Sequence, residues 1–239
     1  MIKKVLISAA GRGTRMLDLS KDKPKHLILA NGKPFLYYLL QNLKDAGFEE
    51  FVMVVGYKKE FMEEFLQEYK KDFNIVLVNQ FDILGEERYG TACPLECVKE
   101  ILQGESFLAV YGDNLYATED LKRLNIDDDY SYVAGLPHDH PENYGVLAVG
   151  EGGLLKEIVE KPAQPIGNLI NTGLYKFTAE VFDYLDKINI SPRGEYELTD
   201  VINLLAKQGK VRALDLQGIW LDFGKPEDIK KVEDYLNSK

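Results

Sequence analysis

The stretch Val5-Leu6-Ile7-Ser8-Ala9-Ala10-Gly11-Arg12-Gly13-Thr14-Arg15 lies near the start of this 239-residue chain, and it decides the fold. Its first six residues form a short apolar run that fits a buried parallel strand, and glycines follow at once. Such a step lets backbone N–H groups approach phosphate oxygens, because glycine has no Cβ and can adopt a positive φ. The stretch therefore predicts an α/β fold that holds a nucleotide's phosphates at the end of its first strand.

The charges around this loop have the opposite sign to the chain as a whole, whose formal net charge is −10. The glycine spacing excludes two other nucleotide loops. Position 16 is Met, whereas a P-loop needs a Gly-Lys-Ser/Thr ending and a dinucleotide fingerprint needs a third glycine. The cations of this short segment are Arg12, Arg15, Lys21, Lys23 and Lys25.

Gly-x-Gly-Thr-Arg followed at a distance by Pro24-Lys25 resembles the signature of the sugar-phosphate nucleotidyltransferases, the nucleotide-sugar pyrophosphorylases. This combination is far more specific than either half. Other segments resemble the family's motifs in the family's order along nearly the whole chain. They are Gly32-Lys33-Pro34, Gly90-Thr91-Ala92, Gly112-Asp113, Tyr144-Gly145-Val146, Glu160-Lys161-Pro162, Asn171-Thr172-Gly173 and Trp220-x-Asp222-x-Gly224-x-Pro226.

Short apolar runs alternate with amphipathic segments up to about residue 111, which is the pattern of βαβ units with a mainly parallel sheet. After about residue 130 the pattern becomes strand-like. Together with the resemblance, this predicts a three-layer Rossmann-like fold with a mostly parallel central sheet and an added β-rich sugar-binding portion. We expect one nucleotidyltransferase domain over 1–239, with a nucleotide-binding part at 1–125 and a sugar-phosphate-binding part at 126–239. The expected strands are 4–9, 51–56, 75–79, 106–111, 130–136, 144–149, 153–159, 170–177 and 211–216, and the expected helices are 33–46, 58–71, 91–103, 178–187, 195–208 and one from Pro226.

Composition and sequence patterns limit the partners and the cellular compartment that this chain can have. The acidic pI near 4.9 argues against a nucleic-acid surface. The N-terminal apolar run is too short for a signal peptide, and no stretch has the length of a membrane span, so we expect a cytoplasmic protein that binds no membrane. Cys93 and Cys97 have no partner pair at zinc-site spacing, which favours a structural role. The oligomeric state stays open, homo-oligomers included.

The resemblance implies a direct reaction. A sugar 1-phosphate oxygen attacks the α-phosphorus of a nucleoside triphosphate, which gives a nucleotide-sugar and pyrophosphate. Such transfer depends on positioning two anions and neutralising their charge. The guanidinium of Arg15 is assigned to the β- and γ-phosphates, and Lys25 to the α-phosphate side. The full nucleotide-binding set is Ala9, Ala10, Gly11, Gly13, Thr14, Arg15, Gln80, Gly90 and Thr91.

Two carboxylates are the expected metal ligands. Asp113 follows an apolar strand and a glycine, and Asp222 matches the family's second ligand. Mg²⁺ prefers such hard oxygen ligands and would act as a Lewis acid at the α-phosphate. With Arg15 and Lys25, Asp113 completes the expected catalytic set. The sugar-phosphate set by resemblance is Tyr144, Gly145, Glu160, Lys161, Asn171 and Thr172.

One departure concerns the choice of base. The family's base-reading glutamine usually lies about five residues before Gly-Thr-Ala, whereas Gln80 lies ten before Gly90, so 81–89 forms a lengthened loop that either displaces Gln80 or adds a lid. The Ala9-Ala10-Gly11 form resembles uridylyltransferases, which ranks UTP first and dTTP second. Two alternatives remain: a cytidylyl- or guanylyltransferase acting on another sugar or alditol phosphate, and a non-catalytic sensor of nucleotides or sugar phosphates.

Overall fold

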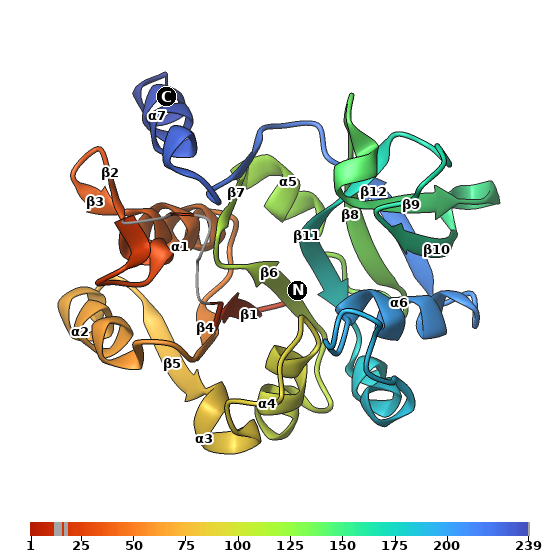
Figure 1. Ribbon diagram of the computed structural model, residues 1–239, viewed down its shortest axis with the longest axis horizontal. Coiled ribbons are helices and arrows are strands. Elements are labelled where there is room, and N and C mark those ends of the chain that lie inside the picture. The colour runs from red at the N-terminus through yellow and green to blue at the C-terminus, as the bar shows by residue number, and fades with distance from the viewer. Residues whose placement is uncertain (12–15, 17–18, 239) are drawn as a thin grey trace.

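A computed structural model describes residues 1–11, 16 and 19–238 of the chain, so the predicted phosphate-loop residues Gly13, Thr14 and Arg15 lie outside the described residues. The fold is α/β with a mostly parallel central sheet, as predicted (Figure 1). The main sheet has the strand order β10-β9-β11-β6-β1-β4-β5, and β8 joins it beside β11 and pairs β12 on its other side.

The first half of the chain builds the parallel part of this sheet. β1 lies between β6 and β4, and β5 follows β4 at the edge, all in parallel register. Helices connect these strands, as parallel neighbours require. These elements are β1 (Lys4–Ala9), α1 (Phe35–Asp45), β4 (Glu50–Val55), α2 (Lys59–Tyr69), β5 (Asn74–Asn79), α3 (Gln80–Leu84), α4 (Cys93–Leu102) and β6 (Phe107–Tyr111).

The second half adds strands to the other side of β6. β11 runs antiparallel to β6, β8 and β9, and β10 pairs β9 as the sheet's other end. The observed strands confirm the β-rich portion predicted after residue 130. These elements are α5 (Thr118–Arg123), β8 (Ser131–Pro137), β9 (Gly145–Val149), β10 (Leu155–Glu160), β11 (Leu169–Phe177), α6 (Leu198–Ala206), β12 (Val211–Asp215) and α7 (Pro226–Asn237).

Two hydrophobic cores cover the two faces of the sheet. Along β1, Val5 and Ile7 belong to the core with α1 and α2, whereas Leu6 belongs to the core with α4 and α6. Side chains of a strand alternate between faces, so an apolar run without alternation is buried on both. The run from Val5 to Ala10, which does not alternate between apolar and polar residues, is therefore the sequence signature of this three-layer arrangement.

Several short elements are absent from the sequence expectations. The helical segment expected at 178–187 is a 3₁₀ helix at Ala179–Lys187, whereas α3 and α5 were not predicted. A short ladder of β7 (Asn114–Tyr116) with β13 (Trp220–Asp222) was missed as well, because three-residue strands carry no clear periodicity. A second small ladder joins β2 (Leu29–Ala30) to β3 (Lys33–Pro34), and further 3₁₀ turns lie at Lys25–Leu27, Pro141–Asn143 and Glu151–Gly153.

In the described part of the chain, no helix has the length and apolar character needed to cross a bilayer.

Candidate active site

The carboxyl ends of β1 and β6 bring the first charged pair together. Ser8 lies opposite Tyr111, and the N–H of Gly112 donates to the carbonyl of Ser8 at 2.9 Å. Asp113 follows directly, and its carboxylate accepts from the ammonium of Lys25, which lies in the 3₁₀ turn. Open α/β sheets bind ligands at this edge. Two of the predicted catalytic residues therefore meet at the expected place.

Lys25 is buried, at 8% exposed, and Asp113 is half-buried. Desolvation raises the pKa of Asp113, but the charge and hydrogen bond of Lys25, together with smaller contributions, outweigh it and hold the pKa of this carboxyl below its ordinary value. Burial and the same ammonium lower the pKa of the neighbouring His26 to about 3, so this imidazole is neutral at physiological pH. The site thus keeps an ionised carboxylate and one compensating cation.

A cavity of about 300 Å³ opens beside this pair. It is lined by most of the predicted nucleotide-binding residues that the structure describes. Ala9 is the exception, because its side chain packs into the core with α1. The predicted residues that line the cavity are Ala10, Gly11, Lys25, Gln80, Gly90, Thr91 and Asp113.

Gly11 contributes space and not an unusual conformation. Its φ is not positive, contrary to the freedom expected from the sequence. Among the residues that the structure describes, none has an atom within 4 Å of a Cβ built at Gly11, and the residue is exposed at the cavity. The glycine therefore leaves backbone accessible to a ligand without backbone strain.

The lengthened segment 81–89 leaves Gln80 inside the cavity. Its first residues form the short helix α3, capped by the side chain of Asn79, which accepts from the N–H of Phe81 at 3.2 Å. Gln80 is 2% exposed and lines the cavity, and its amide donates to the carbonyl of Arg88 at 3.4 Å. The segment then returns to Tyr89 at the same cavity. Of the two expectations for the insertion, displacement of Gln80 is therefore wrong.

A second cavity, of about 330 Å³, adjoins the first. Thr91, Tyr111, Asp113 and Glu195 line both, so the two spaces meet at the end of β6. Every residue of the predicted sugar-phosphate set lies on its wall, together with Asp222. These are Tyr144, Gly145, Glu160, Lys161, Asn171 and Thr172.

Some of these side chains already have partners within the chain. Thr172 is 1% exposed, and its hydroxyl donates to the carbonyl of Ala134 at 2.9 Å. The amide of Asn171 donates to the hydroxyl of Tyr175 at 2.8 Å and accepts from the N–H of Gly173 at 3.1 Å. These contacts shape the wall of the cavity and limit what the two side chains can offer a ligand.

Glu160 and Lys161 present charge more openly. Gly145 pairs with Glu160 across the β9–β10 ladder, and a Cβ at Gly145 would lie 2.9 Å from a carboxylate oxygen of Glu160. Lys161 is exposed and has a φ of +44°, which is rare outside glycine and is typical of functional sites. Its N–H donates to the carbonyl of Tyr144 at 2.9 Å, which holds this strained turn at the cavity.

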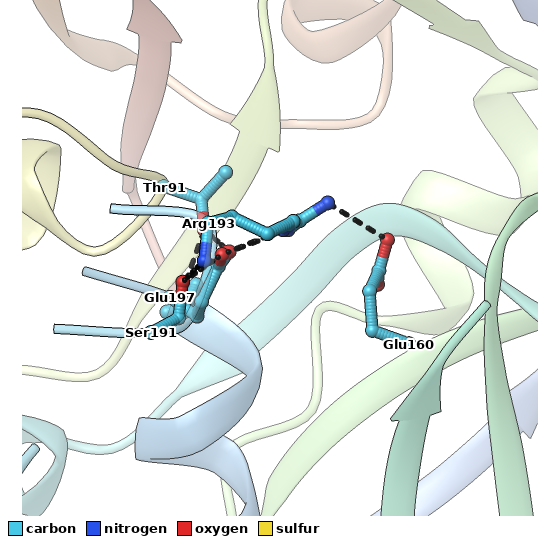
Figure 2. A network of polar contacts seen from close by, with 6 residues as sticks. Thr91, Glu160, Ser191, Arg193 and Glu197 are labelled. Atoms are coloured by element: carbon cyan, nitrogen blue, oxygen red, sulfur yellow. Dashed lines mark hydrogen bonds and ion pairs between the residues drawn. The ribbon is translucent and has the colours of Figure 1, made fainter. Parts of the chain in front are cut away.

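Arg193 is a cation of this cavity that the sequence expectations missed (Figure 2). Its guanidinium donates to the buried carboxylate of Glu197 at 2.8 and 3.1 Å and lies 3.6 Å from Glu160. Ser191 also donates to Glu197, at 3.0 Å. The available signal was an Arg-Gly-Glu sequence after a proline, but only the fold shows that this loop reaches Glu160.

The two predicted metal ligands lie on adjoining segments. The β7–β13 ladder places Asp222 opposite Asn114, and the N–H of Phe223 donates to the carbonyl of Asp113 at 2.7 Å. The carbonyl oxygen of the Asn114 side chain is buried and has no hydrogen-bond partner. Among the described residues, no three His, Cys, Asp or Glu side chains form a group able to hold a metal. Two carboxylates with an unpartnered amide oxygen nearby still fit Mg²⁺, which keeps waters and phosphate oxygens as its other ligands.

Comparison with known proteins agrees with this geometry. The model of the family described as Nucleotidyl transferase matches residues 4–239. The chain belongs to this family. The uridylyltransferase AglF of Haloferax volcanii, named for UTP and glucose 1-phosphate, is 34% identical, and the match covers 99% of this chain and 97% of that protein.

Other relatives of this nucleotidyl transferase are longer. A bifunctional sugar-1-phosphate nucleotidylyltransferase/acetyltransferase of Sulfurisphaera tokodaii is 36% identical over 96% of this chain. The match covers 54% of that protein, so the chain spans about half the length of such relatives. Among solved structures, a UDP-glucose pyrophosphorylase complexed with UDP-glucose superposes with a TM-score of 0.85 at 24% identity and full coverage of both chains, which supports the fold.

Proposed function

We propose that this chain transfers a nucleotidyl group from UTP, with dTTP as second choice, to a sugar 1-phosphate, releasing pyrophosphate. The observation that carries the proposal is the meeting of two cavities at Asp113, one lined by Gly11, Gln80 and Lys25 and the other by Lys161. A reaction between two bound phosphates needs two adjoining subsites with cations at their junction. We retain the division into a nucleotide part at 1–125 and a sugar-phosphate part at 126–239 as part of this proposal.

The first cavity suits a nucleoside triphosphate. Its lining includes the amide of Gln80, which can recognise a base edge, and the ammonium of Lys25. We assign Lys25 to the α-phosphate. Arg15, which lies outside the described residues, is assigned to the leaving β- and γ-phosphates. These cations would neutralise charge on the transferring and leaving groups.

The second cavity suits a sugar 1-phosphate. Lys161 supplies a point charge for the phosphate, and the Glu160 carboxylate can accept hydrogen bonds from sugar hydroxyls. Gly145 leaves the space in which that carboxylate stands. Held this way, a phosphate oxygen of the sugar faces the α-phosphorus side of the first cavity, as direct attack requires.

We propose Asp113 and Asp222 as the residues that would hold Mg²⁺. Such an ion supplies Lewis-acid polarisation of a phosphoryl oxygen when bound. Lys25 pairs with Asp113. This ammonium favours the ionised form of the carboxylate, which is the form that a metal ligand needs.

The substrate names of the relatives leave more than one choice. AglF is named for UTP and glucose 1-phosphate, which favours a uridylyl donor. A cytidylyl or guanylyl donor with another sugar or alditol phosphate is the second candidate, since the cavity's base end is altered by the insertion at 81–89. A non-catalytic sensor is disfavoured, because binding alone has little need of Asp113, Asp222 and Lys25 together.

Pyrophosphate release tests the proposal. The purified chain is incubated with Mg²⁺ and each of the five common nucleoside triphosphates, crossed with glucose, N-acetylglucosamine, galactose and mannose 1-phosphates. We expect release that depends on the sugar phosphate and is strongest with UTP. Nucleotide binding with no release across the panel would contradict catalysis and favour the sensor.

A further inference from the structure

The insertion at 81–89 carries two side chains, Arg88 and Tyr89, that the proposed chemistry does not use. Tyr89 lines the nucleoside cavity and is 40% exposed. The carbonyl of the preceding residue accepts from the Gln80 amide, so Tyr89 lies near Gln80 at the cavity. An aromatic ring beside an amide is a suitable wall for a planar nucleobase, because every base has a face on which a ring can stack.

The backbone from Tyr89 to Ala92 is fixed by the segment that precedes α6. The N–H of Tyr196 donates to the carbonyl of Tyr89 at 3.0 Å, and the N–H of Ala92 donates back to the carbonyl of Tyr196 at 2.9 Å. Gly90, between these contacts, has a φ of +141° and lies against the Tyr196 backbone. The direction in which Tyr89 leaves the backbone is therefore determined by the fold.

The side chain of Arg88 connects the insertion to the neighbouring elements. Its Nε donates to the carboxylate of Glu96 on α4 at 2.9 Å, and its guanidinium lies 4.1 Å from the centre of the Tyr196 ring. Its own carbonyl accepts from the Gln80 amide. One residue thus connects the insertion to α4, to the Tyr196 segment and to the predicted base-reading side chain.

We propose that Tyr89 packs against the nucleobase face of the donor nucleotide and that Arg88 is the positioning residue whose side chain holds Tyr89 at the cavity. This inference rests on the proposed function, because it takes the first cavity to be the nucleoside site. It gives the insertion a role as a wall of the base pocket.

Equilibrium binding separates base contacts from phosphate contacts. UTP and pyrophosphate are titrated calorimetrically into the wild-type chain and into the variants Tyr89→Ala and Tyr89→Phe. We expect Tyr89→Ala to weaken UTP binding about tenfold or more, from the typical value of one base–aromatic stack. Tyr89→Phe keeps the ring and should bind UTP within about twofold of wild type. Pyrophosphate, which has no base, should bind all three alike.

A matched control comes from the same insertion. Ile83 on α3 is 54% exposed and is not among the residues that line the cavity, so Ile83→Ala should leave both affinities unchanged. Steady-state kinetics add a second readout. The KM for UTP should rise in Tyr89→Ala while the KM for the sugar 1-phosphate stays within about twofold, because Tyr89 does not line the second cavity.

The positioning role of Arg88 predicts non-additivity. Arg88→Ala should weaken UTP binding. The double variant Arg88→Ala/Tyr89→Ala should bind UTP as tightly as Tyr89→Ala alone, because Arg88 affects binding only through the position of the Tyr89 ring. Additive losses would contradict this role.

The outcomes are distinct. Wild-type UTP affinity in Tyr89→Ala, or an equal loss of pyrophosphate affinity, would overturn the inference while leaving the proposed function in place. A wild-type chain that binds none of the nucleotides would overturn both.

Discussion

Gly90→Ala is the substitution for which the structure makes the sharpest prediction. A Cβ at this position would lie 2.2 Å from the carbonyl oxygen of Tyr196 and 2.3 Å from its nitrogen. Both are backbone atoms, so no side-chain rotation relieves the overlap. The segments 89–92 and 195–198 would have to separate, and the wall shared by the two cavities would open.

The cost can be worked from the contacts that such a separation breaks. The two backbone hydrogen bonds between Tyr196 and the Gly90 segment would be lost, together with that from the N–H of Leu198 to the hydroxyl of Thr91 at 2.8 Å. At about 1 kcal/mol net for each, the loss is about 3 kcal/mol. The unfavourable φ of +141° adds about 1–3 kcal/mol.

Gly85→Ala is the matched control for the conformational part. Gly85 lies in the same insertion with a φ of +75°, but a Cβ there would meet no atom within 4 Å. It should therefore cost only the backbone strain, again about 1–3 kcal/mol. In urea denaturation followed by intrinsic fluorescence, we expect Gly90→Ala to unfold with a free energy about 3 kcal/mol below that of Gly85→Ala. A difference under about 1 kcal/mol would refute the assignment of this glycine to the contact with Tyr196.

Three further predictions concern the site and the core. Asp222→Asn should lower kcat at least about 100-fold in pyrophosphate release and require more Mg²⁺, and unchanged turnover would remove it from the metal site. Lys161→Met should raise the KM for the sugar 1-phosphate about tenfold or more, whereas Lys156→Met, at an exposed cation on the strand that ends just before Lys161, should not. Lys176→Met should destabilise the chain by about 3 kcal/mol in urea, because the fully buried ammonium donates to Asp128 and to two carbonyls. Burial raises the pKa of Asp128, but hydrogen bonds from a tyrosine and from Lys176 outweigh it and leave that pKa below its usual value. The stability from this carboxylate is thus present at neutral pH and lost as the pH falls below about 4, and the Lys176→Met variant should lose less on acidification.

The parallel half of the fold could be predicted because its signals are local. The run from Val5 to Ala10 is apolar except for Ser8, which fits a strand buried on both faces, and a glycine follows at the ligand edge where the strand has ended. The glycine after α1, Gly47 at a φ of +97°, also ends that helix close to the predicted position, whereas the predicted start at residue 33 lies two residues early because Lys33 and Pro34 form β3. In each case a few consecutive residues carry the whole physical reason.

The parts that could not be predicted depend on contacts between distant segments. In the sequence Arg193 is an ordinary loop cation, and only the fold places Glu160 and Glu197 beside it. Lys176 lies in a strand. Its ammonium can be fully buried because it donates to Asp128, about fifty residues earlier in the chain. Thr172 matches a sugar-binding motif, yet its hydroxyl donates a hydrogen bond to the carbonyl of Ala134. The residue types were visible in the sequence, but their partners are set by the arrangement of strands.

That arrangement also explains why two subsites share one wall. β4 and β5 lie on one side of β1 and β6 lies on its other side, so the strand order reverses between β1 and β6, the strand that precedes Asp113. Ligand sites of α/β sheets form where the direction of winding changes. Here β11 also carries an irregularity between Asn171 and Tyr175, and its Gly173 packs directly on the Tyr111 ring, where a Cβ would lie 2.3 Å from a ring carbon. The sugar-side strand thus touches the last residue of β6. Because both cavities depend on that residue, a substitution that moves Tyr111 should disturb the affinity for both substrates together, whereas Tyr89 should affect the nucleotide alone.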